Sequence, residues 1–147
     1  MNYCEITKQY LIGWIELGEA LWPEHTKNEI TESFNDILGN AKETAFICTY
    51  DKQIIGFINL SIRVDYVEGS SSSPVGYIEG IYVLPEYRKR GISRKLVKMG
   101  EQWALKRNCT EFASDVELDN KNSQKFHERI GFKEANRIVH YIKDIRN

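Results

Sequence analysis

The segment PEYRKRGIS, residues 85–93, places three consecutive cations and a glycine directly after an apolar run. A strand that enters a helix through such a turn directs several backbone N–H groups at one point, and the helix N-terminus adds partial positive charge there. This arrangement binds phosphate with little help from side chains. Gly91 would let a ligand approach the backbone closely. The segment therefore predicts a cradle for a phosphorylated molecule, with charge added at its rim by Arg88, Lys89, Arg90 and Arg94.

Acidic residues occupy the other part of the predicted site. Glu79 lies within the apolar run YIEGIYVLP, and Asp115 lies in TEFASDV. We expect both carboxylates near the carboxyl ends of neighbouring strands, where α/β sheets bind ligands. Lys and Arg are concentrated between residues 87 and 107, whereas residues 1–86 are strongly acidic, although the net charge is only -1. This segregation favours an anionic and a cationic ligand meeting in one molecule.

Composition excludes several other classes of protein. A chain of 147 residues with 41% hydrophobic residues is expected to form one domain, 1–147. It has neither a secretory signal nor an apolar run of the roughly 20 residues that span a bilayer, so we expect a cytoplasmic protein without a membrane partner. The three scattered cysteines favour neither disulfides nor a metal site. The basic excess lies in one helix and its entry turn, which does not favour nucleic-acid binding.

Apolar periodicity and turn residues predict the elements that position these groups. We expect helices over 7–21, with Thr7 as the cap, and over 28–38, 92–107 and 120–130, with Gly39 and Gly131 as two of the stops. Strands are expected over 44–50, 53–63, 77–85, 110–116 and 137–145, and residues 65–76 read as a polar loop. The first two strands form a hairpin, and strand–helix alternation follows. The pattern predicts an α/β fold (α+β type) with a mixed sheet flanked by helices.

Two motifs carry a resemblance to the GNAT superfamily of N-acetyltransferases. The stretch YIEGIYVLPEYRKRGISRKLV resembles its acyl-CoA motif, a strand followed by [QR]-x-x-G-x-[GA] and a helix. Arg88, Gly91 and Ser93 occupy the three marked positions, and Ser93 departs from the usual Gly or Ala. The segment NKNSQKFHERIGF, residues 120–132, resembles the second superfamily pattern. The resemblance implies a single GNAT-like domain with a mostly antiparallel central sheet, acetyl-CoA as cosubstrate, no metal, and a homodimer.

The same resemblance implies roles in holding acetyl-CoA. Backbone groups of Ile81, Tyr82 and Val83 would pair with the pantetheine arm, and an N–H of Tyr82 or Val83 would polarise the thioester carbonyl. The turn at 88–94, which includes Ile92, would bind the pyrophosphate, and Asn120 and Ser123 would contact the far side. His127 stands where much of the superfamily has a tyrosine general acid. Its imidazole would protonate the departing thiolate, or the thiolate would leave without help.

Five further segments resemble the aminoglycoside 6'-N-acetyltransferases of bacteria: LWPEH, DYVEG, SSPV, EGIYVLP and ASD. In that family they form the drug site. The resemblance implies that the drug-binding residues are Trp22, His25, Tyr66, Glu79 and Asp115. Asn136 stands where some relatives have an acid. Glu79, or a water that it holds, would take the proton from the drug amine, while Asp115 would mainly bind ammonium.

Two alternatives to an aminoglycoside acetyltransferase remain open at this stage. The first keeps the fold and the reaction but changes the acceptor to a polyamine, a small metabolite or a protein. The second is a sensor that binds CoA or aminoglycoside without turnover. Comparing kcat/KM across acceptors separates the first alternative from an aminoglycoside acetyltransferase, because a site shaped for the drug should favour the drug over other amines.

Overall fold

The apolar residues from Glu43 to Arg63 form the hairpin that the sequence predicts. In the computed structural model, which describes residues 1–146, β2 (Glu43–Tyr50) pairs antiparallel with β3 (Gln53–Arg63). Asp51 and Lys52 make the turn with φ of 50° and 66°. Positive φ at both positions is the geometry that suits a two-residue hairpin loop. All but three of the residues of β3 are buried, and β3 is the central strand of the sheet.

Three further strands complete a five-stranded sheet in the order β1-β2-β3-β4-β5. They are β1 (Asn2–Glu5), β4 (Val75–Val83) and β5 (Phe112–Ala113). Every pair is antiparallel except β4 with β5. The prediction of a mixed, mostly antiparallel sheet is confirmed. The sequence did not predict β1, because a four-residue edge strand without an apolar run gives no signal of its own.

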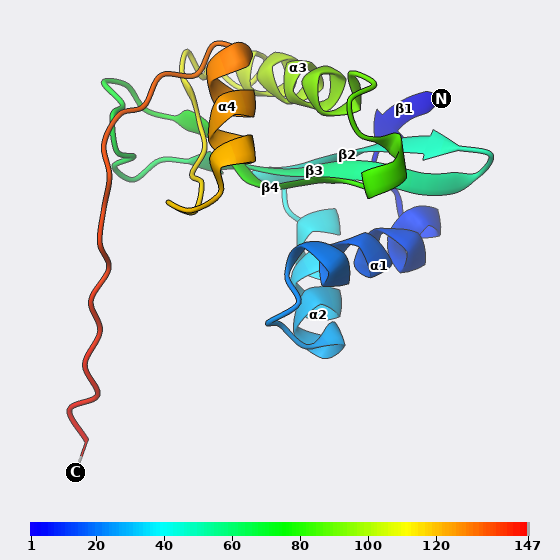
Figure 1. Ribbon diagram of the computed structural model, residues 1–147, viewed down its shortest axis with the longest axis horizontal. Coiled ribbons are helices and arrows are strands. Elements are labelled where there is room, and N and C mark those ends of the chain that lie inside the picture. The colour runs from blue at the N-terminus through cyan, green and yellow to red at the C-terminus, as the bar shows by residue number, and fades with distance from the viewer. Residues whose placement is uncertain (147) are drawn as a thin grey trace. The chain divides into compact units, whose positions relative to one another are not determined.

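Helices cover both faces of this sheet (Figure 1). On one face lie α1 (Leu11–Leu21), which the one-turn helix η1 (Lys8–Tyr10) precedes, and α2 (Lys27–Leu38). The other face is covered by α3 (Ile92–Leu105), which follows the short helix η2 (Pro85–Tyr87). Trp14, Phe34 and Phe57 form the centre of the core between α1, α2 and the sheet. The predicted cap at Thr7 is wrong: its side chain makes no capping bond, because a 3-10 turn precedes the helix.

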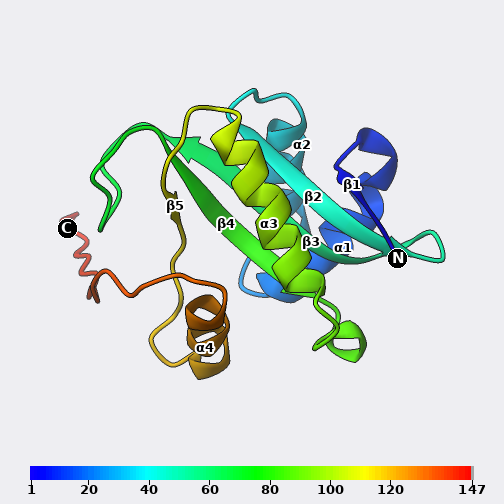
Figure 2. The same cartoon turned by 90° about the horizontal axis from the view of Figure 1, so that it is seen from above.

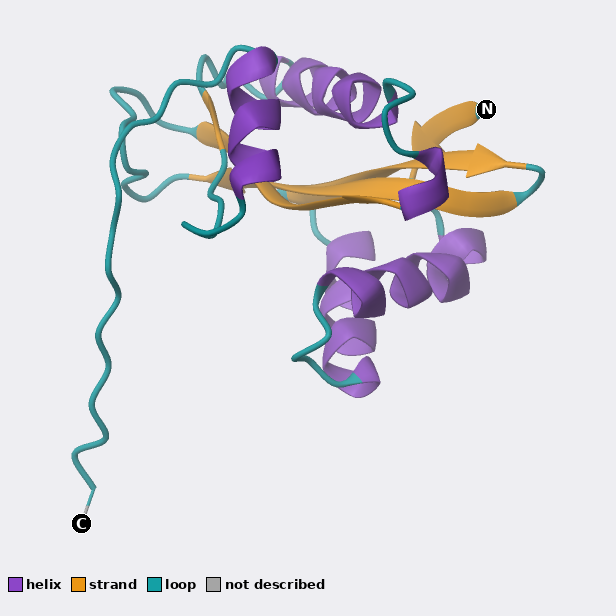
Figure 3. Ribbon diagram, viewed as in Figure 1, coloured by secondary structure: helices purple, strands orange, loops and turns teal. Residues whose placement is uncertain are grey.

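The chain divides into two compact units, Met1–Asp115 and the segment from Val116 onward. The second unit contains α4 (Lys121–Arg129), which ends before Gly131 with φ of 100°. The predicted strand over 137–145 is wrong for the described structure, where residues 133–146 form neither strand nor helix (Figure 3). A strand needs a neighbouring backbone for its hydrogen bonds, and a pattern of apolar residues does not supply one. The strand predicted over 110–116 likewise shortens to the two residues of β5.

The polar loop between β3 and β4 is held by specific contacts. Val67 is buried against Val75 and Tyr77. The Ser71 backbone N–H donates to Glu111 Oε1 at 2.9 Å, and the Ser72 hydroxyl donates to the same oxygen. The part of the loop just before β4 is therefore anchored to the segment before β5.

Candidate active site

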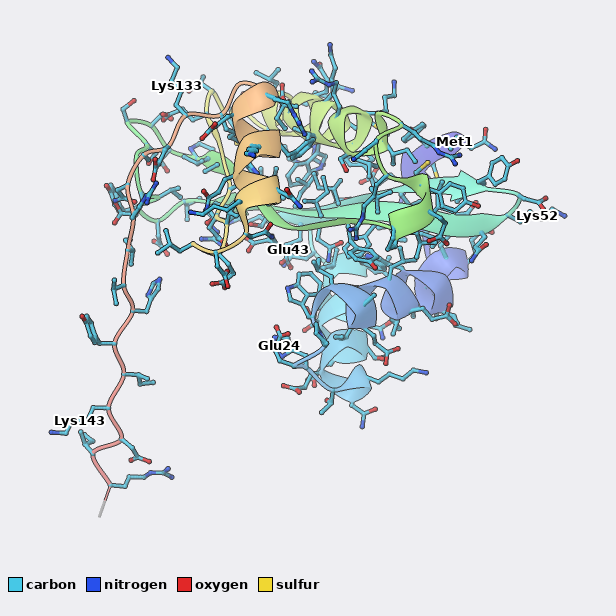
Figure 4. All side chains as sticks on the ribbon, in the orientation of Figure 1. Met1, Glu24, Glu43, Lys52, Lys133 and Lys143 are labelled. Atoms are coloured by element: carbon cyan, nitrogen blue, oxygen red, sulfur yellow. The ribbon has the colours of Figure 1, made fainter. Side chains whose placement is uncertain are left out.

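A cavity of about 820 Å³ lies on the sheet face that α1 and α2 cover. This volume suits a drug-sized ligand. Its walls come from the end of α1, from α2 and from strands β2, β3 and β4. Glu43 lies between the sheet and the helix pair, whereas Glu24 lies on the loop that joins the two helices (Figure 4). The residues that the sequence assigned to the drug and that line the cavity are Trp22, His25 and Glu79.

Trp22 follows α1 directly and forms the aromatic wall of the cavity. Its ring centroid lies 6.2 Å from those of Phe34 and Phe57. A β-carbon built on Gly80 would lie 2.4 Å from Trp22 Cζ2, so the indole rests directly on the backbone of β4. One part of the Trp22 ring therefore packs in the core, and another part lines the cavity.

His25 lies at the entrance to α2 between two carboxylates. Its Nε2 is 3.7 Å from Glu24 Oε1, and its Nδ1 is 3.7 Å from Glu29 Oε2. Thr26 and Glu29 form a capping box that starts α2. The hydrogen bond from the Thr26 backbone lowers the pKa of Glu29, so this carboxylate, which also lines the cavity, stays ionised near neutral pH.

Glu79 occupies a break in the pairing between β3 and β4. Asn59 pairs with Gly80 and Leu60 pairs with Ile78, so Glu79 is the extra residue of a β-bulge. Bulges of this kind redirect a side chain next to an active site. The Glu79 carboxylate accepts three hydrogen bonds from Arg63, at 2.7, 2.9 and 3.1 Å, and one from the Ser61 hydroxyl. The bulge thus presents Glu79 to the cavity with a cation already beside it.

Asp115 is held by a different neighbour. The Tyr77 hydroxyl donates to Asp115 Oδ2 at 2.5 Å, and the Arg63 guanidinium carbon lies 3.4 Å from the centroid of the Tyr77 ring. Burial, and after it the hydrogen bond and charge of Asp115, raise the pKa of Tyr77. Asp115 does not line the cavity, and neither does Tyr66, which is 76% exposed. Their assignment to the drug site stays a prediction.

Three residues of this site escaped the sequence analysis: Ser61, Arg63 and Glu43. Ser61 and Arg63 alternate on β3 toward the cavity, and Glu43 begins β2. Burial raises the pKa of Glu43, and the charge of Glu79 adds to this rise. The polar pair in the motif S-x-R, at the end of a largely apolar strand, is the signal that could have identified Ser61 and Arg63, since a buried strand face seldom carries such residues.

The predicted cradle begins where β4 ends. Lys89 and Gly91 have φ of 63° and 81°, and no side chain caps the first turn of α3. The N–H groups of that turn are therefore available to a ligand. Arg88 bonds within the chain, because its Nε donates to the Val83 carbonyl at 2.7 Å. This bond ties the turn to the strand, while Arg90 lies over the Tyr87 ring at 5.2 Å.

The edge of β4 that faces β5 is paired over two residues. Only Gly76 and Tyr77 pair with β5, and the two segments then diverge (Figure 2). Further along, β3 pairs with Ile81, Tyr82 and Val83 on the other edge. Within the described residues, no strand covers the remaining edge of β4, whose backbone groups are a template for an extended ligand.

Three of the predicted residues of the second unit, Asn120, Ser123 and His127, contact one another. Asn120 Oδ1 accepts from the Ser123 backbone N–H at 3.1 Å and caps α4. His127 Nδ1 lies 2.7 Å from the Ser123 carbonyl oxygen. Because a carbonyl only accepts, Nδ1 carries the proton, and neutral His127 then has no proton on Nε2. Asn136 also lies in this unit. The roles of these four residues stay predictions.

Comparisons with known proteins define the class of protein to which this fold and site belong. Residues 14–132 match the model of the acetyltransferase (GNAT) family, and the chain belongs to this family. It is 41% identical, over 99% of each chain, to a relative from Acinetobacter baumannii named aminoglycoside N(6')-acetyltransferase type 1.

Solved structures give the same result. The structure of AAC(6')-Iy in complex with the bisubstrate analog CoA-S-monomethyl-acetylneamine is 38% identical, with a TM-score of 0.93 over 97% of each chain. The apo crystal structure of the aminoglycoside antibiotic 6'-N-acetyltransferase AAC(6')-IG from Acinetobacter haemolyticus is 36% identical, with a TM-score of 0.93 over 99% of this chain and 100% of that chain. The predicted GNAT fold is confirmed.

Two further properties of the described residues concern other kinds of site. None of the helices among residues 1–146 has both the length and the apolar character needed to cross a membrane. Over the same residues, His, Cys, Asp and Glu side chains do not gather in a group of three or more suited to a metal ion.

Proposed function

We propose that this protein transfers the acetyl group of acetyl-CoA to the 6'-amino group of aminoglycoside antibiotics and thereby gives resistance to them. The observation that carries the proposal is the cavity that brings Trp22, His25 and Glu79 together. Two more acids, Glu29 and Glu43, line the same cavity. Carboxylates beside a flat indole suit a cationic sugar, and the full-length relatives named above support this choice of substrate.

The reaction begins with the loss of a proton from the amine. Alkyl ammonium groups have pKa values of roughly 10, so most of the drug amine arrives protonated. Glu79, or a water that it holds, takes this proton, and the neutral amine attacks the thioester carbonyl directly. Asp115 and Tyr66 bind other parts of the drug, and Asn136 adds a further contact. The Arg63 guanidinium next to Glu79 disfavours a second cation close by, which favours the neutral amine.

Acetyl-CoA is the cosubstrate in this proposal. The open edge of β4 at Ile81, Tyr82 and Val83 binds the pantetheine arm, and one of its N–H groups stabilises the oxyanion. The turn from Arg88 to Arg94 binds the pyrophosphate, with Asn120 and Ser123 on the far side. His127 acts as the general acid only as an imidazolium, because its neutral form holds the proton on Nδ1. The alternative is departure of the thiolate without a proton.

The proposal includes one acyltransferase domain over 1–147, located in the cytoplasm. The match to the family model extends over both units of the chain, which supports a single domain. Cys4, Cys48 and Cys109 are free thiols, as is usual for proteins of a reducing compartment.

The proposal also includes a homodimer, supported by the apolar side chains after α4. Tyr141, Ile142 and Ile145 are 91%, 101% and 87% exposed. Large exposed apolar side chains in one segment mark an interaction surface. Their β-branched and aromatic composition suits a strand, and a second copy of the chain would supply the backbone partner that a strand needs.

Release of CoA thiol tests the activity. The purified protein is incubated with acetyl-CoA and kanamycin or tobramycin, and thiol is followed by absorbance. We expect thiol release that depends on the drug. Its absence at millimolar drug would overturn the proposal, and binding without release would point instead to a sensor. Higher kcat/KM for a polyamine or a peptide than for the drug would support the other acceptor classes.

A further inference from the structure

The two carboxylates assigned to the acceptor are connected through a chain of side-chain contacts. Glu79 accepts from Arg63, Arg63 stacks on the ring of Tyr77, and the hydroxyl of Tyr77 donates to Asp115. Tyr77 is 7% exposed, whereas the side chains of Arg63 and Glu79 are 42% and 34% exposed. The buried Tyr77 side chain thus contacts Asp115 directly and Glu79 indirectly, through Arg63.

Strand register explains how these residues meet. Ser61 pairs directly with Tyr77, and Arg63 pairs with Val75. Side chains two residues apart on a strand share a face, so Ser61 and Arg63 lie on the same face of β3. Tyr77 is their neighbour on that face of the adjacent strand, β4. The bulge then turns Glu79 toward the same pair. On the other side, Tyr77 pairs with Ala113 of β5, two residues before Asp115.

The hydroxyl of Tyr77 does more here than satisfy a buried polar group. A phenol needs only one neutral acceptor, yet its partner is an accessible carboxylate at the end of a short strand. Arg63 is placed similarly: it meets both oxygens of Glu79 through three hydrogen bonds while its flat face rests on the ring. Such a fork fixes the orientation of a carboxylate as well as its charge.

We propose that Tyr77 and Arg63 are positioning residues for acceptor binding: one aromatic ring, with its hydroxyl on Asp115 and a guanidinium stacked on its face, holds Asp115 and Glu79 in a fixed relation. The inference rests on the proposed function. It adds that the acceptor binds between Glu79 and Asp115, and that Tyr77 sets the distance between these two carboxylates.

The test uses Tyr77→Phe, which removes the hydroxyl and keeps the ring beneath Arg63. Steady-state kinetics with acetyl-CoA and kanamycin are measured for the wild type, Tyr77→Phe, Asp115→Asn and the double variant. Tyr50→Phe is the matched control, because Tyr50 lies at the far end of β2 and is half exposed. Thermal unfolding of each variant reports on the fold separately.

We expect Tyr77→Phe to raise the KM for kanamycin roughly five- to tenfold, the net effect of losing one typical hydrogen bond, with the KM for acetyl-CoA unchanged. The double variant should be no worse than Asp115→Asn alone, because the hydroxyl acts through Asp115. Arg63→Lys should recover part of the activity that Arg63→Met loses.

Additive effects of Tyr77→Phe and Asp115→Asn would overturn the inference, as would an unchanged KM for kanamycin or a loss that only follows the unfolding temperature. These outcomes differ from failure of the proposed function, in which the wild type itself releases no thiol with the drug. In that case both the function and the inference are rejected.

Discussion

At the scale of single residues, the main feature is that Glu79, the proposed general base, already has a cation beside it. Four hydrogen bonds from Arg63 and Ser61 converge on Glu79. A carboxylate has about four lone-pair positions; three of these bonds end on Oε2 and one on Oε1, so Oε1 is the oxygen with a position left for the substrate. Partial burial opposes the charged form of Arg63, but the hydrogen bonds and charge of Glu79, together with the charges of Tyr77 and Asp115, outweigh this effect and raise the pKa of Arg63. The guanidinium therefore stays charged beside the Glu79 carboxylate.

The substitution Glu79→Gln removes the base but keeps the size of the side chain. We expect kcat/KM for the drug to fall by about 100-fold, the lower range for loss of a general base. Glu16→Gln, on an exposed position of α1, is the control. A change in kcat/KM no larger than that of the control would remove Glu79 from the mechanism, provided that both variants unfold at the wild-type temperature.

At the scale of elements, the cavity depends on the close approach of α1 to β4. Gly80 follows the bulged residue, and the indole of Trp22 lies where a side chain at position 80 would be. The absence of a side chain at Gly80 therefore lets the C-terminal end of α1 pack directly on β4, with Trp22 in the cavity wall. The bulge directs Glu79 toward the cavity, and the glycine leaves room for the indole of Trp22.

We expect Gly80→Ala to destabilise the protein by about 1–3 kcal/mol, because an added methyl group in a tightly packed place forces neighbours to shift. It should also raise the KM for the drug, since Trp22 must move. Gly39→Ala is the control, because no atom lies within 4 Å of a β-carbon at that position. Urea unfolding of both variants measures the difference, and equal stabilities would contradict the packing described here.

The local features of the fold and site could be predicted from the sequence, whereas those that depend on pairing between distant segments could not. The hairpin at Asp51 and the cradle at Gly91 follow from neighbouring residues. The bulge at Glu79 follows from the register between β3 and β4, which no single segment contains. The contact of Arg63 with Glu79 depends on that register too.

At the scale of the whole molecule, the strand predicted over 137–145 is the main disagreement between sequence and structure. Its composition is that of a strand, yet within the described chain it has no paired neighbour. Whether a pattern becomes a strand depends on an available edge. A second copy of the chain can provide that edge, which links this disagreement to the proposed homodimer.

Light scattering after size exclusion tests this link. We expect a dimer for the wild type and a shift toward monomer for Ile142→Pro, because proline removes a backbone donor from a strand. Leu105→Asp changes a large exposed apolar residue on α3 instead and should remain dimeric. A monomeric wild type, or a dimer that Ile142→Pro leaves intact, would contradict strand pairing through this segment.

The most direct test of the central claim compares two aminoglycosides that differ only at the 6' position. Neomycin carries an amine there and paromomycin a hydroxyl. Thiol release from acetyl-CoA is measured with each drug at the same concentration, and the acetylated product is analysed by mass spectrometry. The proposed function predicts rapid release and a single acetyl group with neomycin and no release above background with paromomycin. Equal rates with both drugs would contradict acetylation of the 6'-amine.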